Sequence, residues 1–95
     1  MTKLRPAVVI SDNSVGKLPL RVVVPVTDWK ERYADFPWFT ELQSTSGNGL
    51  SKRSGADGFS IKSVSLERFA EKLGSLTADD LHDIHYTIVF CLGLG

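Results

Sequence analysis

The sequence is poor in cysteine, balanced in charge and free of long hydrophobic runs, and each absence excludes a class of protein. A single cysteine, Cys91, cannot form an internal disulfide, which excludes a disulfide-stapled secreted scaffold and favours a reducing cytoplasm. Lys plus Arg number 11 and Asp plus Glu number 11, so any nucleic-acid site must be a local patch. The longest apolar runs, such as residues 22–26, are far shorter than the roughly 20 residues of a membrane-spanning helix. We predict a cytoplasmic protein without membrane contact.

Short segments rich in β-branched residues dominate the chain. Their alternation and the turn residues between them predict strands over residues 6–11, 20–27, 38–42, 56–59 and 59–65, and a further strand or turn over residues 69–76. The strand over residues 20–27 is apolar on both faces, so it should be central, and Pro25 should mark where its pairing on one side stops. Residues 28–34 should be a polar connection with one helical turn at most.

The C-terminal part of the chain predicts one helix, from Ala78 to about Leu92. Thr77 can cap its first turn, and the acidic residues that follow suit the positive end of a helix dipole. Its expected apolar arc consists of Leu81, His85, Ile88 and Leu92, with Ile84 and Val89 on its shoulders. Phe90 points nearly opposite, which predicts cover by the protein's own core on one side and by a second subunit on the other.

The length and this order of elements predict one domain over residues 1–95. The fold class should be mainly β (α+β): a small, strongly curved β-barrel with a C-terminal helix.

Four stretches, in order along the chain, carry a resemblance to a known family. They are Arg5 to Ser11, Val24 to Thr27, the segment Gly49 to Ser51 with Ser54 to Asp57, and Ile61 to Phe69. Together they resemble the MazF/PemK family, whose members have an Arg-Pro pair opening an apolar strand and a second strand that ends in Pro, an aliphatic residue and Thr.

The resemblance implies an SH3-like β-barrel of the MazF/CcdB toxin kind and the toxin role in a type II toxin–antitoxin system. It further implies a metal-independent, sequence-specific endoribonuclease that cleaves single-stranded mRNA without a cofactor. The implied partners are single-stranded RNA, a MazE-like antitoxin and a second copy of the chain in a homodimer.

The sequence departs from the family pattern in two places. Family members usually have a further strand and loop before the Arg-Pro pair, so the domain is expected to be N-terminally truncated relative to the family. Lys62 and Ser65 stand where the family often has Arg and Asp. These departures leave an alternative: a catalytically impaired module of the same fold that binds an antitoxin or another protein target.

The candidate site residues follow from the resemblance. Metal-free RNA cleavage needs positive charge against the developing phosphorane and groups that orient the phosphate. The family roles of Arg and Thr pass to Arg5 and Thr27 as catalytic candidates, and Lys62, Ser63 and Lys3 are candidates for RNA binding. Each candidate also has a purely structural interpretation. The basic residues could simply be solvated, Thr27 could bond to its own backbone at the end of a strand, and Ser63 could form a turn.

The tryptophans, the histidines and the cysteine could each have a function, but a structural role is expected for them. Trp29 and Trp38 could stack on RNA bases, but in a small chain they are more often core or interface. His82 and His85 lack the spacing and the further ligands of a zinc site, so a core or interface role is expected for His85. Cys91 has no cationic neighbour in sequence and should be a small buried apolar residue.

Overall fold

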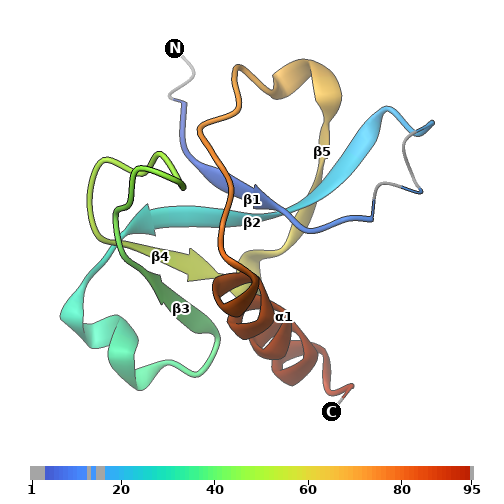
Figure 1. The fold of residues 1–95 in the computed structure, drawn as a ribbon. Coiled ribbons are helices and arrows are strands. Elements are labelled where there is room, and N and C mark those ends of the chain that lie inside the picture. Colours follow the sequence, from blue (N-terminus) through green and yellow to red (C-terminus); the bar gives the residue numbers. More distant parts are fainter. Residues whose placement is uncertain (1–3, 13, 15–16, 95) are drawn as a thin grey trace.

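The computed structural model describes residues 4–12, 14 and 17–94 (Figure 1). The strands are β1 (Ala7–Val9), β2 (Leu20–Asp28), β3 (Phe39–Leu42), β4 (Ser54–Asp57) and β5 (Lys62–Ser65). The short 3₁₀ turns are η2 (Glu31–Asp35), η3 (Gly58–Ser60) and η4 (Leu66–Arg68), and the helix is α1 (Ala78–Leu92). The expected fold class, mainly β with a C-terminal helix, is confirmed.

The long strand β2 is central, as predicted, and all of its pairings are antiparallel. β1 pairs with residues 23–25 of β2, β5 pairs with residues 20–23, and β4 pairs with residues 26–28 and carries β3 on its other side. Pro25 lies between the residues that pair with β5 and those that pair with β4. Because proline has no N–H group to donate, it fits the position where β2 changes partners.

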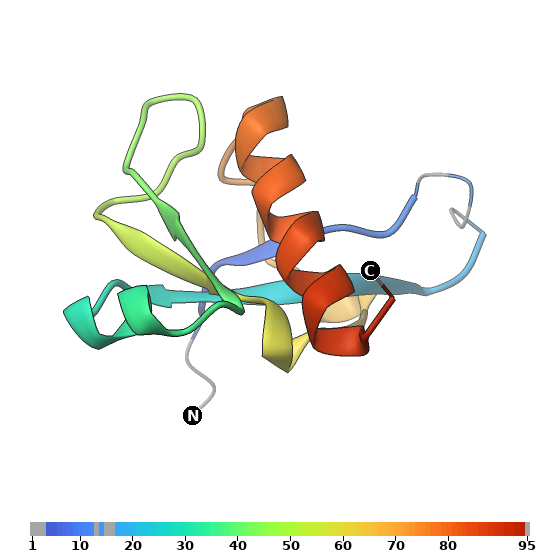
Figure 2. The same cartoon turned by 90° about the horizontal axis from the view of Figure 1, so that it is seen from below.

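The core lies between one face of the bent sheet and α1, which crosses that face (Figure 2). Its buried members are Val24 and Val26 of β2, Leu42 of β3, Ala56 of β4, and Ile84 and Ile88 of α1. Val8 and Ile10 pack against this cluster. Alternate residues of β2 therefore face the helix, and the residues between them face the opposite side of the sheet.

The helix begins and ends where the sequence predicts, and local capping explains both ends. The Thr77 hydroxyl accepts a hydrogen bond from the Asp80 backbone N–H at 3.1 Å, which satisfies one free donor of the first turn. At the other end Gly93 has a φ of 67°, a left-handed conformation that glycine adopts without a Cβ penalty.

The buried face of α1 differs from the predicted arc. Ile88 of the arc and Ile84 on its shoulder are buried as expected, and so is Thr87, whereas Leu92 is 56% exposed and His85 is exposed. The expected core or interface role of His85 thus has no support within this chain. The prediction was wrong because it used apolar side chains alone: Thr87 lies inside, since its hydroxyl donates to the Ile84 carbonyl oxygen at 2.7 Å.

Three strand predictions in the second half need correction. The short strand expected at residues 56–59 is β4, which begins earlier, at Ser54. Phe59, expected to alternate into the next strand, lies in the turn η3 and is 68% exposed. Residues 69–76 form neither a further strand nor a regular turn; part of this segment lies against the loop before β4, where the Ser75 N–H donates to the Gly47 carbonyl at 2.8 Å. A Cβ on Gly74 would stand 2.3 Å from that same oxygen, so this approach requires glycine.

Candidate nucleic-acid interface

The register of β1 against β2, extended beyond the end of β1, sets Arg5 opposite Thr27. Ala7 lies opposite Pro25, and the Val26 N–H donates to the Pro6 carbonyl at 3.1 Å, so the pairing continues past the end of β1. Paired residues of antiparallel strands project on the same face, so the guanidinium and the hydroxyl belong to one surface. Arg5 is exposed and Thr27 is half-buried, which leaves both within reach of solvent.

The RNA-binding candidates divide between the two faces of the sheet. Lys62 pairs with Val23, which has the same parity along β2 as Thr27, so Lys62 lies on the face of Arg5 and Thr27. Val23, the partner of Lys62, lies four positions before Thr27 along β2, a distance of roughly 13 Å at the usual rise of a strand. Ser63 pairs with Val22 and therefore projects to the opposite face. Lys3 lies outside the described residues.

An aromatic cluster borders Thr27 on the same face. Thr27 pairs with Gly55 of β4, and a Cβ on Gly55 would stand 3.1 Å from both the Phe39 ring and the Trp29 ring. Tyr33 stacks on Phe39 with ring centroids 4.0 Å apart and meets Trp29 edge to face at 5.7 Å. The aromatic rings thus fill the space that glycine leaves beside the candidate catalytic threonine.

The two tryptophans contact other aromatic side chains, as the core interpretation expects. Trp38 is half-buried and stacks on Phe36 with centroids 5.0 Å apart. Trp29 is also half-buried, and its indole N–H is buried without a hydrogen-bond partner among the described residues. Phe59, close to Trp38, is the most exposed ring of this group.

Arg53 is a residue of this surface that sequence reasoning missed. Its guanidinium donates to Glu41 and, at 3.1 Å, to Glu31, and it lies over the Trp29 ring at 5.4 Å. The hydrogen bond from Arg53 holds the pKa of the Glu41 carboxyl below its usual range, and the same pairing raises the pKa of Arg53. The only local signal was a lone arginine in a serine- and glycine-rich stretch, whereas its partners lie on β3 and η2.

The potential metal ligands are dispersed. Within residues 4–12, 14 and 17–94, no group of three or more His, Cys, Asp or Glu side chains is placed to hold a metal ion. Cys91 is half-buried, and burial raises the pKa of its thiol, with the negative charge of Asp57 adding to the effect. Cys91 is therefore a poor nucleophile at neutral pH.

Comparison with known proteins shows which family the chain belongs to. A family model described as "PemK-like, MazF-like toxin of type II toxin-antitoxin system" matches residues 1–92. The chain belongs to this toxin family. No curated protein is significantly similar to it in sequence.

Solved structures of MazF toxins share the fold. The Mycobacterium tuberculosis toxin MazF-mt6 superimposes with a TM-score of 0.81 at 17% identity, covering 96% of this chain and 88% of that one. MazF in a MazE–MazF crystal from Deinococcus radiodurans gives 0.78 at 26% identity, covering 94% and 82%. An endoribonuclease in complex with its cognate antitoxin, from a mycobacterial species, gives 0.79 at 18% identity, covering 96% and 82%.

None of the helices in the described part of the chain has both the length and the apolar character needed to cross a bilayer.

Proposed function

We propose that this toxin is a metal-independent endoribonuclease that cleaves single-stranded RNA in the cytoplasm, with residues 1–95 as a single toxin domain. The observation that carries the proposal is the register of β1 against β2, which, continued past Pro6 and Val26, sets Arg5 opposite Thr27. Membership of the toxin family supports it, as does the endoribonuclease activity named for a structural neighbour.

The proposed chemistry divides between the two residues. Cleavage by attack of the ribose 2′-hydroxyl builds negative charge on a five-coordinate phosphorus, and a guanidinium can donate two parallel hydrogen bonds to its oxygens. Arg5 takes this role. The Thr27 hydroxyl orients the phosphate or the attacking group. The products are a cyclic phosphate and a 5′-hydroxyl, because no water enters the first step.

Lys62 and the aromatic cluster extend the proposed site. Lys62, on the same face and about 13 Å along β2, supplies a point charge for a neighbouring phosphate. Phe59, more than half exposed beside Trp38, offers a ring on which an unpaired base can stack. Lys3 stays a candidate phosphate contact, and Ser63, on the opposite face of the sheet, is the weakest of the candidates.

The test is cleavage of a labelled single-stranded RNA by the wild type and by matched variants. Arg5→Ala is expected to lower the rate about a hundredfold or more, as does loss of other transition-state donors. Arg5→Lys should also be poor, since an ammonium cannot form the paired bonds, and Thr27→Val should lose activity without changing the strand. Lys72→Ala, an exposed lysine that is not among the proposed site residues, is the control and should cleave like the wild type.

Two results would contradict this assignment. Wild-type cleavage by a folded Arg5→Ala variant would move the chemistry to other residues. Activity that EDTA abolishes and magnesium restores would refute the metal-independent mechanism. If the wild type cleaves no RNA, the alternative of an impaired toxin module, suggested by Ser65 in place of the family Asp, gains support.

We also propose that the toxin forms a homodimer and is neutralised by a MazE-like antitoxin. Phe90 and Leu92, near the end of α1, are 54% and 56% exposed, and Leu94 just beyond is 71% exposed. An apolar surface of this kind favours burial against another chain. Sedimentation should show a dimer that Phe90→Glu dissociates; a wild-type monomer at high concentration would contradict the homodimer. The antitoxin partner is supported by the neighbours crystallised with theirs.

A further inference from the structure

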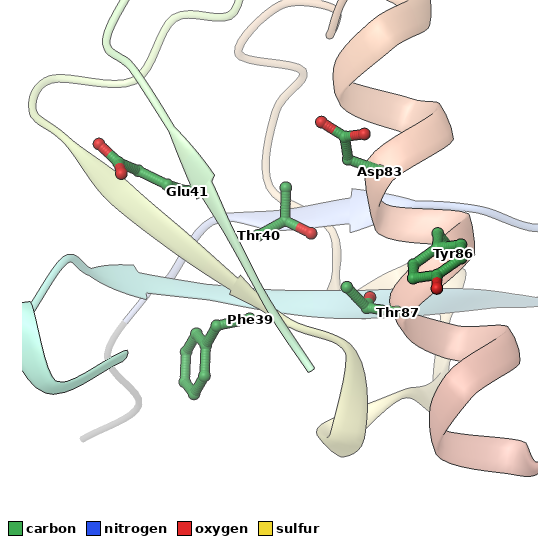
Figure 3. Close-up of a pocket in the computed structure, with 6 residues that line it drawn as sticks. All are labelled: Phe39, Thr40, Glu41, Asp83, Tyr86 and Thr87. Carbon is green, nitrogen blue, oxygen red and sulfur yellow. The ribbon is translucent and has the colours of Figure 1, made fainter. Parts of the chain in front are cut away.

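A groove lies between β3 and α1, on the helix side of the sheet. Its volume is about 360 Å³, and its lining consists of Phe39, Thr40, Glu41, Asp83, Tyr86 and Thr87. Figure 3 shows Thr40 and Asp83 directed into the space between the strand and the helix, whereas Phe39 projects to the other side of β3. The alternation of the strand explains this, because Thr40 shares the helix-facing side with the core residue Leu42.

One polar group of the groove, the Thr40 hydroxyl, has no hydrogen-bond partner among the described residues. Thr40 is only 7% exposed, and its Oγ1 has no hydrogen-bond partner among the described residues. Thr87, on the facing helix, is buried to the same degree, but its hydroxyl donates to the Ile84 carbonyl. A buried hydroxyl without a partner is costly, so a bound group that bonds to Thr40 has an energetic advantage.

The groove lies along a strand edge that is open in this chain. Among the described residues β3 is the outer strand, with the order β1-β2-β4-β3. The Gly58 N–H donates to the Trp38 carbonyl, so the backbone groups of residues 38, 40 and 42 face β4. The N–H and C=O groups of Glu41 and the C=O group of Phe39 therefore face outward, where an added strand could pair with them.

The negative charge of Asp83 favours a strand that carries a basic side chain at this position. Asp83 forms no ion pair with any described residue, and Tyr86, three residues along α1, offers an aromatic ring that is 68% exposed. A carboxylate beside an exposed ring suits a guanidinium or an ammonium group. Glu41 adds negative charge nearby, although Arg53 already pairs with it.

We propose that the β3 edge binds an extended peptide of a partner protein, whose backbone pairs with Glu41 and whose arginine or lysine side chain enters the groove. The cation meets the Asp83 carboxylate and the Tyr86 ring, and its N–H donates to the Thr40 hydroxyl. The residues that would hold the cation, Thr40, Asp83 and Tyr86, are on the helix side of the sheet and are not among those proposed for RNA cleavage.

The probe is a phage-displayed library of random linear peptides, selected on the full chain. The enriched peptides should share an arginine or lysine between β-branched residues. Affinity of a selected peptide should fall roughly tenfold or more in Asp83→Asn, as expected for loss of a charged hydrogen bond. Thr40→Val should also weaken binding. Asp79→Asn, on the same helix but outside the groove, is the matched control and should bind like the wild type.

Amide hydrogen exchange separates strand addition from binding elsewhere. Peptide binding should slow exchange of the Glu41 amide, because its N–H gains a partner. The proposal is overturned if no peptide is enriched, if enriched peptides lack a basic residue, or if Asp83→Asn binds unchanged. It is equally overturned if the Glu41 amide is already protected in the wild type because two copies pair through β3.

Discussion

Replacing Thr40 with valine should stabilise the folded protein, although threonine and valine have nearly the same shape. Thr40 Oγ1 is buried and has no hydrogen-bond partner among the described residues. A buried polar group left without a partner costs about 1–3 kcal/mol, and valine removes that cost without opening a cavity. We expect the free energy of unfolding to rise by about 1 kcal/mol or more, and the melting temperature by about 4–8 °C per kcal/mol in a domain of this size.

Thr87→Val is the matched control for this prediction. Thr87 is 6% exposed, faces the same groove and differs from Thr40 mainly in that its hydroxyl donates to the Ile84 carbonyl at 2.7 Å. The same substitution there removes a hydrogen bond, so it should lower stability by about 1 kcal/mol. The larger methyl group would also crowd Gly58, whose backbone lies close to Oγ1.

The assay is thermal unfolding of both variants and the wild type, by calorimetry, at one pH and without added ligand. The expected result is opposite signs: Thr40→Val melts above the wild type and Thr87→Val below it. A Thr40→Val variant that is destabilised as much as Thr87→Val would show that the Thr40 hydroxyl has a partner. Thr40 would then offer no free hydroxyl for a ligand group to bond.

Three further predictions concern other parts of the molecule. Gly58→Ala should destabilise the fold by about 1–3 kcal/mol in a urea titration, because an added Cβ would stand 2.5 Å from the Thr87 hydroxyl, and wild-type stability would contradict this contact. The pKa of Glu41 is lower in the folded state than its ordinary value of 4.5, so its pairing with Arg53 stabilises the fold above that value and the contribution is lost as pH falls through the folded pKa. Glu41→Gln should therefore be less stable than the wild type at pH 7, and the difference should shrink at pH 3; a gap that is unchanged at both pH values would refute the ion pair. Burial raises the pKa of Cys91, so iodoacetamide should alkylate the folded protein at pH 8 more slowly than the same protein in urea, and equal rates would refute the burial.

The sequence by itself determined the parts of the fold that depend on local patterns. The β-branched run of β2, the proline within it and the Thr77 cap each act over a few residues, so the central strand and both ends of α1 were predictable. The family motifs likewise singled out Arg5 and Thr27 as candidates, because each belongs to a short string of neighbours. What those strings could not state is that the two residues face each other, which depends on the register of β1 against β2.

Only the tertiary structure decided which side chains meet across elements. The face that α1 buries depends on Thr87 satisfying its own hydroxyl, which a count of apolar residues cannot detect. Arg53 reaches Glu41 and Glu31 from a stretch without any periodic pattern. The β3 groove is the clearest case: Thr40 and Asp83 are far apart in sequence, and neither has a motif. Hydrophobic periodicity specifies the elements, whereas long-range packing determines which polar groups find partners and which remain open to a ligand.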